Sequence, residues 1–293
     1  MIEISLQVRP AVHEDQRQIA NLLFFESHTH RHLDWRAPLD WLGFPDFWVV
    51  EENGHLVAAL ACPQSPPGVA WMRLFAHAAR VRLEEAWTAL WHTAQTEIAR
   101  QGGAVVAVIA MQTWLDTLLS QNGFTHTQDI VMLEWNRWIT TTGNPQPRTD
   151  IRAMTPDDLP RVAELDAAAF SLLWQNPQDA LSKALAQAQV ATVMEDGRGL
   201  AGYQISTANP FGTHLARLAV RPDAQGAGLG SAIVLDLIQR LKRQGSARLT
   251  VNTQSDNHAS LALYRKLGFR HTGEQYSVYC FDVSPNPIGE TYP

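Results

Sequence analysis

The chain has 293 residues, a length that favours two domains over one, and 45% of the residues are hydrophobic while 18% are charged. No apolar run approaches the roughly 20 residues needed to cross a bilayer, which argues against a membrane-spanning protein. The net charge of -6 argues against general affinity for nucleic acid or for an anionic membrane, but not against a local phosphate site built from backbone amides.

The start of the chain and its cysteines favour a cytoplasmic protein. The first residues lack a basic stretch followed by an apolar one, so no secretory signal is expected. Cys62 and Cys280 fall in different halves of the chain and are too few for a disulfide framework.

The sequence matches itself at an offset of 143 to 145 residues. Five pairs of segments match in the same order, and such a series is hard to obtain by chance, although each pair alone is weak. We therefore expect two copies of one fold. The matching segments are 8–23 with 151–166, 50–60 with 194–204, Arg73-Leu74 with Arg217-Leu218, 100–108 with 243–251, and Gly123-Phe124 with Gly268-Phe269.

A polar run with proline and glycine, ITTTGNPQPRTD, separates the copies and has no apolar period. The expected domains are 1–138 and 151–283, joined by a linker over 139–150 and followed by an irregular tail over 284–293.

Each copy is expected to run strand, helices, hairpin strands, strand, helix, strand, helix, strand. This order implies two α/β (α+β) domains, each with a mixed, mostly antiparallel sheet flanked by helices. In the second copy the expected helices are 155–170, 233–241 and 259–267, and the expected strands are 189–194, 200–207, 214–220, 248–252 and 276–283.

The segment 218–231, between a strand and a helix of the second copy, carries the strongest chemical signal. Gly226, Gly228 and Gly230 would let the backbone approach a ligand, and the free amides of the next helix's first turn would bind a phosphate or pyrophosphate. The spacing lacks the third glycine position of a dinucleotide fingerprint and the Lys-Ser/Thr of a nucleotide P-loop. A glycine-rich turn without a ligand is the alternative.

The pattern around this loop resembles the GNAT superfamily of acyl-CoA-dependent N-acetyltransferases. Its signature couples Val-x-Pro-x-x-Gln/Arg-Gly-x-Gly-x-Gly/Ala to a downstream Asn, then Tyr, then Gly-Phe. The residues that carry the resemblance are Val220, Pro222, Gln225, Gly226, Gly228, Gly230, Asn257, Tyr264, Gly268 and Phe269.

The resemblance implies a set of residues that bind acetyl-CoA. The amides after Gln225 would hold the CoA pyrophosphate, the strand end at Leu218 would pair with the pantetheine arm, and Asn257 would bond the same arm. A helix N-cap is a second, compatible role for Asn257. The implied cofactor-binding residues are Leu218, Ala219, Val220, Gln225, Gly226, Ala227, Gly228, Leu229, Gly230, Ser231, Asn257 and Tyr264.

The resemblance also implies that the Tyr264 phenol donates a proton to the departing thiolate, with packing in an apolar helix as the alternative. The general base is less clear. The ribosomal-protein N-terminal alanine acetyltransferases, which look similar, place a glutamate at the position of Asn252, and an amide cannot take a proton at neutral pH. His214, on the preceding strand, is a second candidate for the base or an ordinary surface residue.

The first copy is expected to keep the fold without the cofactor site. Its segment 76–87 has no glycine, and Glu84 and Glu85 would repel a phosphate. Tyr264 corresponds to about Leu119, and Asn257 to Gln112 or Thr113. Tandem GNAT proteins with one inactive copy, such as mycothiol synthase, are similar in layout.

Two further features of the first copy are open. The run His28-Thr-His-Arg-His32 could bind a metal but lacks carboxylate or cysteine companions, so no metal is expected. The neighbouring aromatics are expected in an interdomain core, in a wall of the acceptor site or on a partner surface. They are Trp35, Trp41, Phe44, Phe47 and Trp48.

Together these features predict an acetyl-CoA-dependent N-acetyltransferase in which a primary amine attacks directly. The acceptor would be a small molecule or a peptide N-terminus. The alternative is a non-catalytic acyl-CoA-binding sensor or scaffold protein. The missing base and the degenerate first copy favour this alternative.

Overall fold

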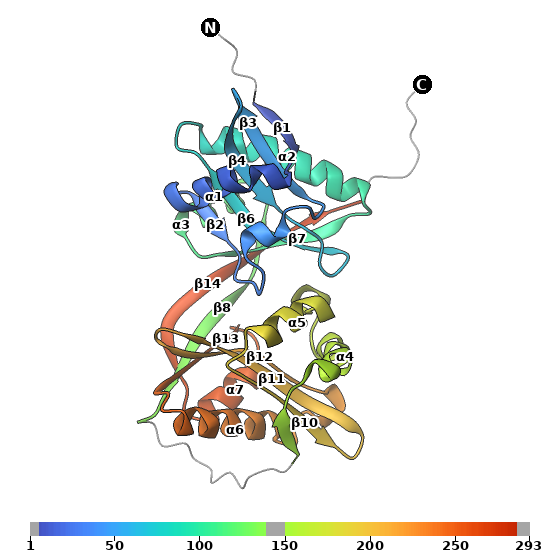
Figure 1. Ribbon diagram of the computed structural model, residues 1–293, viewed down its shortest axis with the longest axis vertical. Helices are drawn as coiled ribbons and strands as arrows, with labels where there is room; N and C mark the ends of the chain where they lie inside the picture. Colours follow the sequence, from blue (N-terminus) through green and yellow to red (C-terminus); the bar gives the residue numbers. More distant parts are fainter. Residues whose placement is uncertain (1–5, 139–149, 286–293) are drawn as a thin grey trace. The chain divides into compact units, whose positions relative to one another are not determined.

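The computed structural model describes residues 6–138 and 150–285 and divides into two compact units. Unit 1 comprises Met1–Thr127 with Ser277–Pro293, and unit 2 comprises Gln128–Tyr276. Both are mixed α/β units, as the sequence predicts (Figure 1). No helix in the described ranges is long and apolar enough to span a membrane.

Unit 1 is built on a five-stranded sheet in the order β1-β3-β4-β6-β2, with the parallel pair β5 and β7 beside the end of β14. Its elements are β1 Gln7–Pro10, α1 Gln16–Phe25, β2 Thr29–Arg31, β3 Phe47–Glu52, β4 His55–Ala61, β5 Val69–Trp71, β6 Leu74–His77, α2 Leu83–Arg100, β7 Ala104–Ala110 and α3 Thr113–Gln121, with short 3-10 turns at His13–Asp15 and Pro38–Trp41.

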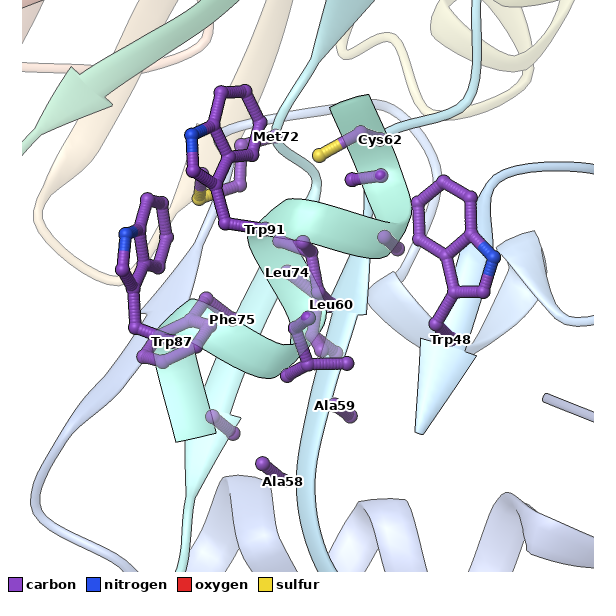
Figure 2. Close-up of a cluster of buried hydrophobic side chains, with 14 of the residues drawn as sticks. Trp48, Ala58, Ala59, Leu60, Cys62, Met72, Leu74, Phe75, Trp87 and Trp91 are labelled. Carbon is purple, nitrogen blue, oxygen red and sulfur yellow. The ribbon is translucent and has the colours of Figure 1, made fainter. Parts of the chain in front are cut away.

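The core of unit 1 forms where α2 packs on the sheet. Apolar side chains recur at helical spacing along α2, and β4 is apolar along almost its whole length. Figure 2 shows Trp87 and Trp91 of α2 near Phe75 of β6, and the rings of Phe75 and Trp87 meet edge to face at 5.4 Å.

Unit 2 repeats most of this order around its own sheet, in which β13, β12, β11, β10 and β9 are neighbours, but it has α5 where unit 1 has β2 and, among the described residues, no counterpart of β5. Its elements are β9 Ile151–Ala153, α4 Leu159–Ala169, α5 Gln178–Ala186, β10 Val190–Asp196, β11 Gly199–Asn209, β12 Gly212–Val220, α6 Leu229–Arg243, β13 Arg248–Gln254, α7 His258–Lys266 and β14 Arg270–Val283, with 3-10 turns at Pro156–Asp158, Leu172–Trp174 and Pro222–Ala224.

Helices cover both faces of β11. A Cβ at Gly202 would lie 2.8 Å from Ile233 of α6, whereas the next residue, Tyr203, donates a hydrogen bond to Asp166 of α4. Because successive side chains of a strand point to opposite faces, α6 and α4 lie on opposite faces of the sheet.

The repeat seen in the sequence extends to individual contacts. Arg9 forms a bidentate pair with Asp15 in unit 1, with N–O distances of 2.7 and 2.8 Å, and Arg152 forms the same pair with Asp158 in unit 2, with both distances at 2.7 Å. Each arginine also bonds a glutamate on the neighbouring hairpin.

The last strand of each half of the chain begins in its own unit and ends in the other. β8 (Thr125–Asn136) pairs antiparallel with β13 in unit 2, from Ile130 with Gln254 to Asn136 with Arg248. The end of β14 pairs with β7 in unit 1, from Ser277 with Ala110 to Val283 with Ala104. The ranges 1–138 and 151–283 therefore describe the sequence repeats and differ from the compact units. Most of the expected linker and tail, 139–149 and 286–293, lies outside the described residues.

The expectation for the aromatic run was wrong for three of its members. Trp41, Phe47 and Trp48 lie in the core of unit 1 itself and are only 3 to 4% exposed. They are covered by their own unit and need neither substrate nor a partner. Trp35 is half-buried, and Phe44 is 43% exposed.

Candidate functional site

The site begins where two strands of unit 2 separate. β12 pairs with β11 along its length, but it pairs in parallel with β13 only from Thr213 with Leu249 to Leu215 with Val251. A register shift opposite Ala216 accompanies this separation. In the described register, the end of β12 therefore has an open backbone edge on its β13 side.

Leu218 and Val220 present their backbone groups to this edge. The N–H of Arg221 donates to the carbonyl of Ala201 on the β11 side. Since backbone groups alternate in direction along a strand, the amides of Leu218 and Val220 point to the open edge, whereas Ala219 bonds β11. The Gln225 side chain donates to the Val220 carbonyl at 3.0 Å and so ties the following loop to the strand.

The loop after β12 presents exposed glycine backbone. Gly226 and Gly228 have φ values of +77 and +81, a left-handed conformation that favours glycine, and a Cβ on either would meet nothing within 4 Å. Gly228 is the N-cap of α6, so the amides of Leu229, Gly230 and Ser231 have no carbonyl partner within the helix. Residues 225–228, which include Ala227, are exposed.

Gly230 differs from the other two glycines. It is buried in the first turn of α6, and a Cβ there would come within 2.7 Å of Leu263 on α7. The glycine pattern predicts that Gly230 admits a ligand, whereas in the structure its missing side chain lets α6 approach α7.

α7 carries Asn257 and Tyr264. The Asn257 side chain accepts a hydrogen bond from the Ser260 amide at 3.0 Å, so the predicted N-cap is confirmed. Tyr264 is 4% exposed and lies in the unit 2 core, against which Leu218 packs. Its hydroxyl has no hydrogen bond to another described residue, and burial raises its pKa, so the phenol is protonated at neutral pH.

His214, the candidate for the base, and Asn252, which stands where the similar acetyltransferases have a glutamate, lie together at the point where β12 and β13 separate. His214 Nδ1 lies 2.9 Å from the Thr250 hydroxyl of β13. Burial lowers the pKa of His214, and a hydrogen bond with the Asn252 side chain opposes that shift. The imidazole is therefore neutral at pH 7, the form that accepts a proton.

Unit 1 closes the corresponding edge with its own chain. The pairs Ala58 with His77 and Gly202 with Val220 hold the same place in the two sheets, so His77 corresponds to Val220. In unit 1, β2 pairs antiparallel with this edge of β6, and the His77 amide donates to the His28 carbonyl at 3.4 Å.

The connection that follows β6 also differs. Five residues, 78–82, join β6 to α2, compared with eight, 221–228, between β12 and α6. Glu84 and Glu85 lie in the first turn of α2. The glycine loop and the open edge, both found in unit 2, are thus both missing from the described part of unit 1.

The histidines of the run 28–32 are placed separately. The His30 ring bonds the Met72 carbonyl at 3.0 Å, the His32 ring lies against Trp71, and the His28 ring stacks on His77. Within residues 6–138 and 150–285, no group of three or more His, Cys, Asp or Glu side chains could hold a metal.

A buried polar network that was not predicted from the sequence lies beside the site. Asp166 is completely buried on α4 and bonds both Arg217 of β12 and Tyr203 of β11. The sequence repeat contains a sign of this network. The positions of α1 and α4 match residue by residue, and the apolar Leu23 of α1 corresponds to the charged Asp166 of α4.

Comparisons with known proteins agree with this geometry. Residues 159–269 match the profile of the Acetyltransferase (GNAT) family. The N-alpha-acetyltransferase RimI of Mycobacterium tuberculosis is 34% identical over 143 residues, which cover 47% of this chain and 88% of that protein. The ribosomal protein bS18-alanine N-acetyltransferase of Escherichia coli (strain K12) is 27% identical over 129 residues, 44% of this chain and 86% of that protein.

Among solved structures, a tandem GNAT protein from the clavulanic acid biosynthesis pathway covers 97% of this chain with 100% of its own length, at 17% identity and a TM-score of 0.64. This likeness shows that the tandem fold extends over nearly the whole chain.

Proposed function

Because the chain belongs to the GNAT family of acetyltransferases, we propose that its second unit transfers the acetyl group of acetyl-CoA to a primary amine by direct attack. The observation that carries the proposal is the open backbone edge of β12, which leads directly into the exposed glycine loop at the start of α6.

The residues present fit acetyl-CoA. The amides of Leu229, Gly230 and Ser231 would hold the pyrophosphate at the positive end of α6, and the left-handed Gly226 and Gly228 keep this surface free of side chains. The amides of Leu218 and Val220 would pair with the pantetheine arm as an added strand does. Bound acetyl-CoA would supply an acyl group activated as a thioester.

Two side chains would move the protons. The protonated Tyr264 hydroxyl would donate to the thiolate that leaves. His214, kept neutral by burial and held by Thr250, would take the proton of the amine, directly or through water, while Asn252 orients its ring.

The acceptor is proposed as a small-molecule amine or a peptide N-terminus. Two relatives support a peptide acceptor, the N-alpha-acetyltransferase RimI and the ribosomal protein bS18-alanine N-acetyltransferase. A third supports a small-molecule acceptor: the Mycothiol acetyltransferase of Saccharomonospora viridis is 40% identical over 62 residues.

A free-thiol assay with a panel of amines and peptides tests the proposal. Thiol release from acetyl-CoA that depends on an added acceptor is expected. Binding of acetyl-CoA without such release would contradict the proposal and would indicate the alternative, a non-catalytic acyl-CoA-binding sensor or scaffold.

A further inference from the structure

A buried ion pair connects the segment 170–176, between α4 and α5, to the strand that carries the open edge. Arg217 donates from Nε and Nη2 to the two carboxylate oxygens of Asp166, each at 2.7 Å, and from Nη2 to the Trp174 carbonyl at 2.7 Å. Its guanidinium lies 3.5 Å from the ring centre of Phe170. The Asn176 amide donates to the same carboxylate at 2.8 Å.

Unit 1 shows that the fold does not require this pair. The sheet registers and the helix positions align Asp166, Arg217 and Tyr203 with Leu23, Leu74 and Ala59, which are all buried and apolar. The register thus matches Arg217 with Leu74 and corrects the sequence alignment, which paired it with Arg73.

Comparing the two units distinguishes an ion pair that the fold itself uses from one that is found beside the candidate site alone. The pair Arg152 with Asp158 is repeated in unit 1, as expected of a contact that serves the fold. Replacing a buried ion pair by packed apolar residues often leaves stability unchanged, and unit 1 has apolar residues at these positions. The Asp166–Arg217 pair occurs only in the unit with the glycine loop.

The pair lies next to the candidate site, on the face that the cofactor loop does not use. Leu218 packs toward α6, and its neighbour Arg217 points to the opposite face, toward α4 and 170–176. An amine that reaches the open edge from that face would meet this segment.

We propose that Arg217 and Asp166 are positioning residues that fix 170–176 as the wall of the acceptor site. The segment has the sequence FSLLWQN, without a charged residue, and its Leu172 side chain is 50% exposed. Such a wall suits an amine whose neighbouring group is apolar and uncharged, and it offers no carboxylate to a polycation. The inference rests on the proposed function.

The test compares Arg217→Lys with Arg152→Lys in the full chain. Each change keeps the charge and removes a bidentate contact, but only the first touches the proposed wall. The acceptor probes are phenethylamine, which carries an apolar group, and ethanolamine, which does not.

The wild type should have the lower KM for phenethylamine. Arg217→Lys should raise that KM about tenfold while changing the Kd for acetyl-CoA less than about threefold, and Arg152→Lys should change neither. A triple variant with leucine at 166 and 217, as at the equivalent positions of unit 1, and phenylalanine at 203, D166L/R217L/Y203F, should still fold and bind acetyl-CoA but lose the preference for phenethylamine.

If a folded Arg217→Lys or triple variant kept the wild-type ratio of the KM for phenethylamine to the KM for ethanolamine, the inference would be overturned and the proposed function would stand. A lower KM of the wild type for ethanolamine than for phenethylamine would also overturn the inference and leave the proposed function intact. Absence of acceptor-dependent thiol release from the wild type with every amine and peptide of the panel would overturn both.

Discussion

At the scale of single residues, the features that depend on near neighbours in the chain could be predicted. The Asn257 cap needs only Ser260 three residues later, and the left-handed glycines 226 and 228 follow from a turn that leads into a helix. The role of Gly230 and the Asp166 network could not be predicted in this way, because both depend on side chains from other elements.

Gly228→Glu should abolish CoA binding and leave the fold intact. The new side chain would cover the amides at the start of α6 and repel the pyrophosphate, while its own Cβ meets nothing within 4 Å. Isothermal titration with CoA measures the effect.

Gly245→Glu is the matched control. Gly245 has nearly the same φ, +79, and equally open surroundings, but it lies beyond the other end of the 15-residue α6, a helix about 22 Å long. Tight CoA binding by a folded Gly228→Glu protein, or equal loss in both variants, would contradict the assignment of the loop.

Tyr264→Phe should lower turnover by about 10²-fold and leave acetyl-CoA affinity almost unchanged, because it removes the proton donor and keeps the ring in the core. The measurement is single-turnover acetyl transfer alongside a binding titration. Equal rates under conditions in which chemistry limits turnover would show that Tyr264 has only a packing role.

At the scale of elements, the order of strands and helices in the second copy was predicted correctly, and the short strand β2 was not predicted at all. β2 has three residues and no alternation, so nothing local marks it as a strand. Its conformation depends on the edge of β6, which is distant in sequence. The same edge in unit 2 is open, so equivalent strands have different partners in the two copies.

Acid should destabilise unit 1 through two buried histidines, His30 in β2 and His32 just after it. Burial lowers the pKa of His30 to about 4, and burial also lowers the pKa of His32. Because these folded-state pKa values lie below those of the unfolded chain, their contribution to stability is complete above pH about 6.5 and is lost as pH falls toward 4. For His30 alone, the loss between pH 7 and pH 5 is roughly 2 kcal/mol.

Urea unfolding at pH 7 and pH 5, followed by tryptophan fluorescence, measures this loss. His30→Gln keeps an N–H donor for the Met72 carbonyl but does not titrate, so its stability should fall less over the same interval. An identical pH dependence in the two proteins would contradict the assignment to His30.

At the scale of the whole molecule, the duplication could be predicted from the sequence, but the exchange of final strands could not. β8 and β14 end equivalent repeats, and the pattern of apolar residues does not determine which sheet each joins. The expected ranges therefore gave each repeat its own last strand.

The full chain should bind one CoA. In unit 1 the connection to α2 has no glycine, two glutamates lie in the first helical turn, and β2 occupies the strand edge. Calorimetry should give a stoichiometry near one, and Gly228→Glu should abolish all of the binding. Two comparable sites, or binding that survives Gly228→Glu, would contradict this expectation.

The strand exchange also determines the order in which the chain can complete its folding during synthesis. Domains usually fold in the order in which they leave the ribosome, N-terminal first. Here unit 1 requires residues 277–283, which are translated after all of unit 2, whereas unit 2 needs nothing beyond residue 276. Unit 1, most of which precedes unit 2 in the sequence, is therefore completed after unit 2, and until then β7 presents an unpaired edge from Ala104 to Ala110.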